Sequence, residues 1–205
     1  GPPPDSADVL VSAADEESVI GARVRDLLAQ PEARRIIVAC DGCRDRTAEA
    51  ARAAGGDRVR VVEFPVRRGK AAVLNDLVSA SDADVLVFTD ANTRFEPGAL
   101  RSLLAPFADP AVGAACGRLI LEAPDGATPE ASLWDRETRT KEAEGALGVC
   151  VGANGAIYAV RRALVRMLPP DTTSMDDFLI PAGASLSGAR VVFAGEVVVV
   201  IGILA

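Results

Sequence analysis

The chain has 205 residues, 49% of them hydrophobic and 25% charged, which is enough apolar material for one well-packed domain. Its formal net charge of -7 argues against a general nucleic-acid binder, because phosphate backbones attract basic surfaces. The absence of histidine excludes histidine triads, general bases and metal ligands, so any chemistry must use carboxylates, lysine, arginine, hydroxyls or thiols.

The first 121 residues alternate between short apolar runs and stretches with helical spacing. Strands are predicted over residues 8–13, 35–40, 58–64, 84–89 and 112–121. Helices are predicted from the spacing of Ile20, Val24, Leu27 and Leu28 before Pro31, over residues 45–56 with Gly55-Gly56 as a C-cap, and over residues 69–80. The alternation predicts an α/β fold in which helices cover both faces of a mostly parallel sheet.

After about residue 122 the pattern changes. A polar loop over residues 122–132 and a charged helix over residues 133–148 are predicted, followed by GANGAIYAVRR (152–162) and PPDTTSMDDFLIP (169–181). The final run VVVVIGILA (197–205) is much shorter than the ~20 residues that span a bilayer. This run either forms a terminal strand or leads into further residues of a longer protein. No composition break separates the halves, so we expect a single domain over residues 1–205.

Four cysteines raise the question of thiol chemistry. Cys40 and Cys43 form a C-x-x-C pair, which is typical of redox or zinc sites, whereas Cys116 and Cys150 lie in apolar or turn-like contexts. The opening GPPPD is too polar for a targeting segment, and the cysteines fit a reduced, cytoplasmic setting better than a disulfide framework. A thioredoxin-like oxidoreductase or a zinc-binding module is therefore an open but weaker interpretation, because there is one C-x-x-C and no histidine to complete a zinc set.

Two aspartates each follow a predicted strand. Asp41 comes after IIVAC and Asp90 after VLVFT, and the carboxyl ends of parallel strands meet at one edge of the sheet. Asn92 adds an amide oxygen two residues after Asp90, and such oxygens suit Mg²⁺ or Mn²⁺, which could bridge a diphosphate. The alternative is that each aspartate only caps the turn or helix that follows it.

Two further charged groups are candidates for binding or catalysis. Lys70, with Arg67 and Arg68, forms a basic turn that either contacts a ligand phosphate or is simply solvated. No P-loop or dinucleotide-binding motif is present in the sequence. The adjacent carboxylates of Asp176 and Asp177 repel, which suits one of them to general-base work, although a helix N-cap followed by a first-turn acid explains the pair equally well.

Several segments occur together in a characteristic order: VLVSAADEESVI, IIVACDGCRDRT, RRGKAAVLN, VLVFTDANTRFEPGAL, GANGAIYAVRRALV and MDDFLIPAGASLSGARVVFAGEVVV. This series, over roughly residues 8–200, resembles the family 2 glycosyltransferases with the GT-A fold. The resemblance implies a Rossmann-like, mostly parallel sheet, with a nucleotide-sugar-binding half over residues 8–121 and an acceptor and catalytic half over residues 122–200. The opening P-x-Y-N-E of that family is altered here to Ser12, Ala14, Asp15 and Glu16.

The resemblance also implies roles for individual residues. Asp177 would be the catalytic base, and Asp90 and Asn92 would hold Mg²⁺ or Mn²⁺, with Asn92 replacing the second acid usual in the family. The implied nucleotide and donor contacts are Ala13, Asp15, Glu16, Asp41, Lys70, Asp90, Ala91 and Asn92. The implied lining of the donor sugar and acceptor region is Gly152, Ala153, Asn154, Gly155 and Asp176.

The function implied by the resemblance is inverting transfer of a sugar from a nucleoside-diphosphate sugar, with a UDP-sugar expected, to an acceptor hydroxyl. The expected acceptor is a carbohydrate or a lipid-linked molecule in cell-surface polysaccharide or glycoconjugate synthesis. We expect a cytoplasmic location, at the membrane face if parts beyond this chain bind the membrane. A catalytically inactive nucleotide-binding module is the main alternative, because the opening segment is altered.

Overall fold

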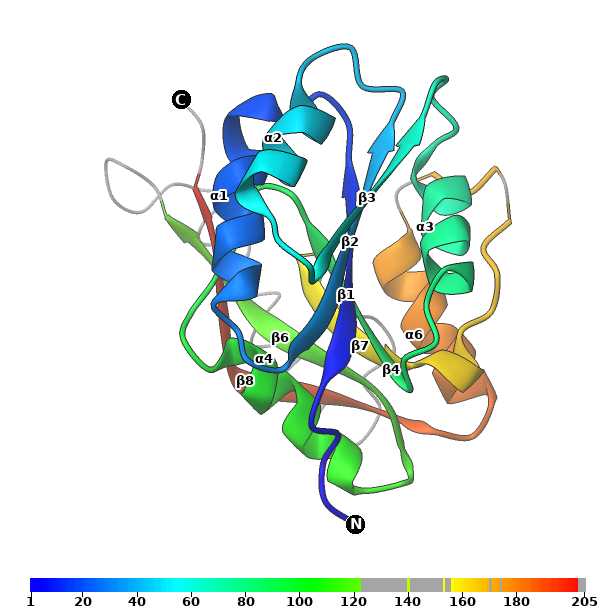
Figure 1. Cartoon of the computed structure of the whole chain (residues 1–205). Helices are drawn as coiled ribbons and strands as arrows, with labels where there is room; N and C mark the ends of the chain where they lie inside the picture. Colours follow the sequence, from blue (N-terminus) through cyan, green and yellow to red (C-terminus); the bar gives the residue numbers. More distant parts are fainter. Residues whose placement is uncertain (123–139, 141–152, 154–155, 170, 174, 203–205) are drawn as a thin grey trace.

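The computed structural model describes residues 1–122, 140, 153, 156–169, 171–173 and 175–202. Within these residues, an eight-stranded sheet has helices against both faces (Figure 1). The strands are β1 (Ala7–Ala13), β2 (Ala33–Asp41), β3 (Val59–Phe64), β4 (Val85–Asp90), β5 (Thr93–Phe95), β6 (Val112–Glu122), β7 (Ile157–Arg161) and β8 (Arg190–Gly202). The α-helices are α1 (Glu17–Leu28), α2 (Thr47–Ala54), α3 (Lys70–Ser79), α4 (Ala99–Leu104) and α6 (Asp176–Leu186).

The strand order of the sheet is β3-β2-β1-β4-β7-β6-β8-β5. Strands β3, β2, β1 and β4 are parallel neighbours, and β8 is parallel to β6. Strand β7 is antiparallel to β4 and to β6, and β5 is antiparallel to β8 at the edge. The predicted mostly parallel sheet is therefore confirmed, with β7 as an antiparallel strand in its interior.

Residues of the central strands alternate between two hydrophobic cores, as the period-2 geometry of a strand requires. Val9 and Val11 of β1 face a core that includes residues of α1, α2 and α4. Leu10 faces the opposite core, which includes residues of α3 and α6. Because both faces are covered, the strands can be almost wholly apolar, which explains the short apolar runs in the sequence.

Helix α2 ends where the sequence predicts, but the prediction that Gly55 is a glycine C-cap is wrong. Helix α2 does end at Ala54, but Gly55 has φ −88° and ψ −173°, which is extended backbone and not the left-handed conformation of a glycine cap. A Cβ at Gly55 would lie 2.7 Å from the Cβ of Val59. Glycine is needed here because the chain passes closely over the first residue of β3.

Other predictions for the chain have mixed outcomes. The terminal strand is found, since β8 extends to Gly202. The predicted loop and charged helix over residues 123–148 lie outside the described residues, apart from Thr140. Among the residues that the structure describes, none belongs to a helix long and apolar enough to cross a membrane.

Candidate active site

A polar cavity of about 260 Å³ lies at the carboxyl edge of β1, β2 and β4. Its lining residues are Ser12, Ala13, Ala14, Glu16, Asp41, Arg67, Gly69, Lys70, Val73 and Asp90. Asp41 and Asp90 are the last residues of β2 and β4, and parallel pairing through β1 brings these two strand ends to the same edge. The structure therefore brings together much of the predicted donor-binding set: Ala13, Glu16, Asp41, Lys70 and Asp90.

Three predicted donor-binding residues are not among those that line this cavity. Asp15 is exposed, with φ +60°, and its carboxylate accepts a hydrogen bond from the backbone N–H of Arg44 at 2.7 Å. Ala91 is buried, and Asn92 is exposed in the turn between β4 and β5. Asn92 is thus next to the end of β4 in the chain, but the structure does not place it on the cavity wall.

Asp41 determines the shape of the loop before α3. Its carboxylate accepts hydrogen bonds from the backbone N–H groups of Arg68 at 2.7 Å and Gly69 at 2.9 Å. Gly42 has φ +62°, and a Cβ there would lie 2.5 Å from the nitrogen of Arg67, so the two loops are in close contact. Asp41 therefore does not simply cap the turn that follows it; it fixes a distant loop and with it the position of Lys70.

Lys70 links the two halves of the site. Its Nζ lies 3.1 Å from Oδ1 of Asp90 and 3.1 Å from Oδ1 of Asp176. Burial would lower the pKa of Lys70, but these two carboxylates outweigh that effect and raise the pKa above its ordinary value. Lys70 is therefore a cation shared by the end of β4 and the start of α6, which the sequence did not indicate.

The neighbouring arginines differ in their surroundings. The guanidinium of Arg68 stacks on the ring of Phe64 at 4.8 Å and pairs with Asp76 of α3. Arg67 lines the cavity. Of the three basic residues of this turn, Arg67 and Lys70 are therefore the ones placed to meet a ligand phosphate.

Asp176 and Asp177 form the first turn of α6. Met175 is the N-cap residue and makes no capping hydrogen bond through its side chain, so the N-cap alternative for Asp176 is wrong, whereas both residues are first-turn acids. Asp176 is buried and accepts a hydrogen bond from the hydroxyl of Tyr158 at 3.0 Å. Asp177 is half-buried.

Pro181 changes the hydrogen bonding of this first turn. In a regular helix the N–H of residue 181 would donate to the carbonyl of Asp177, but proline has no N–H. The freed carbonyl of Asp177 accepts a hydrogen bond from the N–H of Ala153 at 2.8 Å. Ala153 belongs to the predicted sugar and acceptor segment, and the proline leaves the carbonyl of Asp177 available to this residue. Gly152, Asn154 and Gly155 lie outside the described residues.

Two residues that support the site were missed from the sequence. Tyr158 is the only tyrosine of the chain, and burial together with the Asp176 carboxylate raises the pKa of Tyr158 well above its ordinary value. Arg23 is buried among the apolar residues of α1 and donates to the hydroxyl of Thr89 at 2.6 Å, just before Asp90. Arg23 could have been found from the sequence, because it is an arginine within the apolar spacing of Ile20, Val24 and Leu27. Tyr158 could not, because a lone tyrosine in a strand is not a signal for a functional site.

The cavity has an excess of carboxylates, which fits a divalent cation. Burial, together with the negative charges of Asp90, Asp45 and Asp15, raises the pKa of Glu16. The side chain of Asp90 is 36% exposed and presents oxygen, the donor that Mg²⁺ and Mn²⁺ prefer. Asp90 therefore offers one carboxylate ligand to a hard cation at the end of β4, where its Oδ1 is paired with Lys70.

The geometry does not favour thiol chemistry. Burial and the neighbouring Cys43 raise the pKa of the Cys40 thiol to about 12, so this thiol stays protonated at neutral pH, the opposite of what a redox cysteine requires. Cys43 contacts the carbonyl oxygen of Ala13 at 3.6 Å. Cys150 lies outside the described residues.

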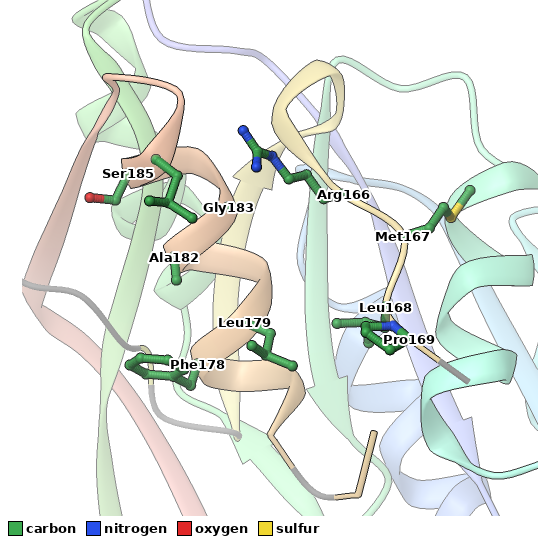
Figure 2. A pocket seen from close by; sticks show the side chains of 10 residues that line it. Arg166, Met167, Leu168, Pro169, Phe178, Leu179, Ala182, Gly183 and Ser185 are labelled. Carbon is green, nitrogen blue, oxygen red and sulfur yellow. The ribbon is translucent and has the colours of Figure 1, made fainter. Parts of the chain in front are cut away.

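A second, mainly apolar cavity of about 430 Å³ lies along α6 (Figure 2). Its lining residues are Arg166, Met167, Leu168, Pro169, Phe178, Leu179, Ala182, Gly183, Ser185 and Leu186. None of the lining residues is acidic, and none lines the polar cavity. The two cavities are therefore chemically distinct. The polar one is lined by the candidate donor-binding residues, whereas Asp177 is not among its lining residues.

Two Rhizobium proteins are similar to part of this chain. The succinoglycan biosynthesis protein ExoU of Rhizobium meliloti (strain 1021) is 36% identical over 104 residues, which are 50% of this chain and 30% of that protein. An N-acetylglucosaminyltransferase of Rhizobium leguminosarum bv. trifolii is 30% identical over 122 residues, which are 56% of this chain and 67% of that protein. The chain thus matches less than a third of the length of ExoU.

Solved structures with the same architecture include two sugar transferases, both 22% identical to this chain, an identity that supports the fold alone. The mannosyltransferase PcManGT from Pyrobaculum calidifontis, in complex with GDP-Man and Mn²⁺, has a TM-score of 0.75 and is matched over 98% of this chain and 58% of its own. The glucosyl-3-phosphoglycerate synthase from Mycobacterium tuberculosis, in complex with Mn²⁺, UDP-Glc and phosphoglyceric acid, has a TM-score of 0.64. The match covers 98% of this chain and 71% of that protein's chain. The fold is therefore the GT-A fold.

The family model described as glycosyl transferase family 2 matches residues 8–165, from the second residue of β1 to beyond the end of β7, and this range includes every residue that lines the polar cavity. The ordered motifs, the shared fold and this match lead to one conclusion: the chain belongs to glycosyl transferase family 2.

Proposed function

We propose that this chain catalyses inverting transfer of a sugar from a nucleoside-diphosphate sugar to an acceptor hydroxyl. The observation that carries the proposal is the position of Lys70, within 3.1 Å of both Asp90 and Asp176. This ion-paired group sets the first turn of α6, which carries Asp177, beside the strand end predicted to bind the diphosphate. The base would then lie in the helical turn that is ion-paired to the donor end of β4.

On the donor side, Asp90 and Asn92 would hold Mg²⁺ or Mn²⁺. When bound, the cation would supply charge stabilisation to the departing diphosphate. Glu16, Asp41, Arg67 and Lys70 would surround the nucleotide, with a UDP-sugar as the proposed donor. The solved relatives support a nucleoside-diphosphate sugar with a divalent cation, since one is in complex with GDP-Man and Mn²⁺ and another with UDP-Glc and Mn²⁺.

In the chemical step, Asp177 would accept the proton of an acceptor hydroxyl as the hydroxyl oxygen attacks the anomeric carbon. The bond from that carbon to the diphosphate oxygen breaks as the new bond forms, so the configuration inverts and no covalent enzyme intermediate is needed. The proton ends on Asp177 and the electron pair on the leaving diphosphate. We further propose a carbohydrate or lipid-linked acceptor and a cytoplasmic setting, consistent with a relative that acts in succinoglycan biosynthesis.

The test is Asp177→Asn, which keeps the shape of the side chain and removes the proton acceptor. We expect affinity for UDP-sugar in the presence of Mn²⁺ to stay within about threefold and transfer to fall by ~10² or more, the usual scale for losing a general base. Calorimetry measures the first quantity, and mass spectrometry of a glycosylated acceptor measures the second.

Asp171→Asn is the matched control, because Asp171 is an exposed acid that precedes the same helix, whereas Asp177 is half-buried in its first turn. It should leave both quantities unchanged. Full transfer by Asp177→Asn would remove Asp177 as the base. Tight nucleotide binding without transfer by the wild-type chain would instead support the inactive module.

A further inference from the structure

We propose that Tyr158 is a positioning residue for sugar transfer: its hydroxyl holds Asp176, and through Asp176 the first turn of α6, in place against the donor end of β4. The inference rests on the proposed function, because it assumes that Asp177 is the base and that the donor binds at Asp90. It adds a residue that lines neither cavity and whose hydroxyl acts through another side chain.

The ring of Tyr158 is held rigidly by the sheet. Tyr158 lies on β7 opposite Phe88 of β4, and the two rings stack with their centroids 4.8 Å apart and their planes 9° apart. The side chain is fully buried. Because β7 is hydrogen-bonded on both sides, to β4 and to β6, the hydroxyl of Tyr158 has a fixed position relative to the strand end that carries Asp90.

The hydroxyl belongs to a continuous chain of polar contacts. Tyr158 donates to Oδ2 of Asp176 at 3.0 Å, and Oδ1 of Asp176 lies 3.1 Å from Nζ of Lys70. Lys70 in turn lies 3.1 Å from Asp90. The buried carboxylate of Asp176 is therefore held at both oxygens, by β7 on one side and by α3 on the other.

Donor binding would affect the contact of Asp176 with Lys70 differently from its contact with Tyr158. The ammonium group of Lys70 is shared with Asp90, so a cation or a phosphate that arrives at Asp90 competes for the same charges. The hydroxyl of Tyr158 is neutral and does not line the polar cavity, so a ligand at Asp90 would leave its bond to Asp176 in place, and this bond would strengthen as Lys70 turns away from Asp176. Tyr158 is thus the contact that keeps the first turn of α6 in place when the donor rearranges Lys70.

Asp177 is fixed by the same turn. Its carbonyl accepts the N–H of Ala153, and its neighbour Asp176 is tied to Tyr158. A base must lie within hydrogen-bond reach of the proton that it abstracts, and small displacements of a catalytic group cost large factors in rate. Packing alone requires only the ring of Tyr158, which phenylalanine would supply; the hydroxyl is the group that acts on this turn.

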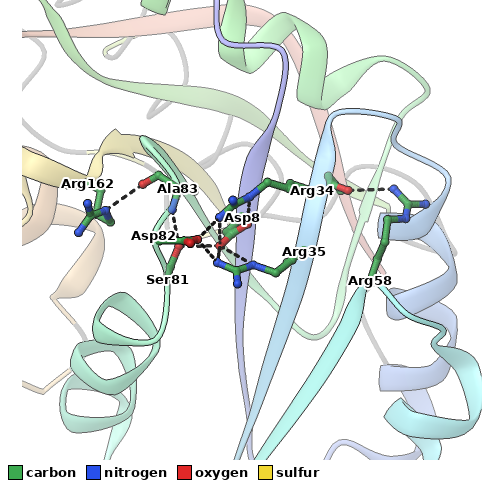
Figure 3. A network of polar contacts seen from close by, with 9 residues as sticks. Asp8, Arg34, Arg35, Arg58, Ser81, Asp82, Ala83 and Arg162 are labelled. Carbon is green, nitrogen blue, oxygen red and sulfur yellow. Dashed lines mark hydrogen bonds and ion pairs between the residues drawn. The ribbon is translucent and has the colours of Figure 1, made fainter.

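The first experiment is Tyr158→Phe, compared with Ser81→Ala as a matched loss of a buried hydroxyl. Ser81 donates to Oδ2 of buried Asp8 at 2.6 Å, at the opposite edge of the sheet (Figure 3). We expect Tyr158→Phe to keep donor affinity and donor KM within about threefold while kcat falls about tenfold, the lower end for losing an outer-shell partner at a site. Ser81→Ala should lower stability and leave kcat within about twofold.

The second experiment needs no turnover. Because Tyr158 is the only tyrosine of the chain, biosynthetic 3-fluorotyrosine gives one ¹⁹F resonance that reports this site alone. We expect this resonance to shift when UDP and Mg²⁺ are added, and the shift to be much smaller in Asp176→Asn. Calorimetry on the same samples shows whether UDP binds.

The outcomes separate the inference from the function on which it rests. If wild-type chain binds no UDP with Mg²⁺, the proposed function fails and the inference fails with it. If UDP binds and the fluorine resonance does not move, or if Tyr158→Phe turns over like the wild type, the inference is overturned while the function stands. Should Tyr158→Phe not fold, the fluorotyrosine experiment on the wild-type chain decides alone.

Discussion

At the scale of single residues, Lys70 has the most consequences, because one ammonium group serves two carboxylates from different parts of the chain. Asp176 is buried, and a buried carboxylate that loses its partner retains an uncompensated charge. The side chain of Lys70 is itself 36% exposed, so solvent weakens the pair relative to a fully buried one. Lys70 should therefore matter for both stability and ligand binding.

We predict that Lys70→Met lowers the free energy of unfolding by about 1–2 kcal/mol, because the buried carboxylate of Asp176 loses its cationic partner. Urea denaturation at neutral pH measures this loss. The control is Arg68→Met, which removes a pair with Asp76 in which both side chains are more than 40% exposed, and should cost less than ~1 kcal/mol. Equal losses in the two variants would contradict a special role for the Lys70 pairs.

At the scale of elements, helix α6 contains a proline that affects both its stability and its contact with Ala153. A proline inside a helix normally costs stability because a carbonyl loses its donor. Here the carbonyl of Asp177 gains the N–H of Ala153 in exchange, so Pro181 both interrupts the helix and leaves a site for Ala153. The helix is locally weaker, and Ala153 is bonded to it.

We predict that Pro181→Ala raises the free energy of unfolding by roughly 1–3 kcal/mol and lowers transfer. The new N–H of residue 181 would compete with Ala153 for the carbonyl of Asp177 and so loosen the segment that contains Ala153. Urea denaturation and the transfer assay on one preparation give both numbers. Pro31→Ala, at an exposed proline outside any helix, should change neither much. A more stable variant with full transfer would show that the Ala153 contact is not needed for the reaction.

At the scale of the whole molecule, the two edges of the parallel sheet have different roles. The carboxyl ends of β1, β2 and β4 carry the polar cavity, whereas the amino ends carry a network centred on Asp8 (Figure 3). The fully buried carboxylate of Asp8 accepts hydrogen bonds from Arg34 at 2.8 Å, Arg35 at 2.7 Å and Ser81 at 2.6 Å. These contacts tie β1 to β2 and to the segment before β4, far from the site.

We predict a pH-dependent contribution of Asp8 to stability. Burial would raise the pKa of Asp8, but the hydrogen bonds from Arg34, Arg35 and Ser81 outweigh it and lower the pKa below its ordinary value. A lowered carboxyl pKa gives stability that is present above the unfolded pKa, about 4, and is lost as pH falls through the folded pKa. Asp8→Asn should therefore be destabilised by about 2 kcal/mol or more at pH 7, with a smaller difference from wild type at about pH 3.

Urea denaturation at several pH values measures this difference. Asp82→Asn is the control, because Asp82 pairs with the same two arginines but its side chain is 75% exposed, and its effect should be smaller at every pH. A gap between wild type and Asp8→Asn that does not narrow in acid would mean that the lost charge is not the cause.

The sequence predicted the strand-end part of the site well and the part formed by α6 and β7 poorly. Asp41 and Asp90 could be brought together because the apolar runs that precede them predict parallel strands, whose ends must share an edge. The contact of Lys70 with Asp176 and the bond from Tyr158 to Asp176 depend on how β7 and α6 pack after a long intervening segment, and no local pattern encodes that. The close contact of Gly55 with Val59 was equally invisible, because glycine signals both caps and tight packing.

The position of β7 also affects how the chain folds as it leaves the ribosome. Strand β7 lies between β4 and β6, although it is synthesised after both, and β6 pairs only with β7 and β8 among the described strands. Until residues 157–161 emerge, one side of β4 and both sides of β6 present unpaired backbone groups, which invite pairing with other chains. Vectorial synthesis therefore leaves the sheet incomplete until β7 and β8 have emerged, so the nascent chain exposes strand edges of the kind that favour aggregation.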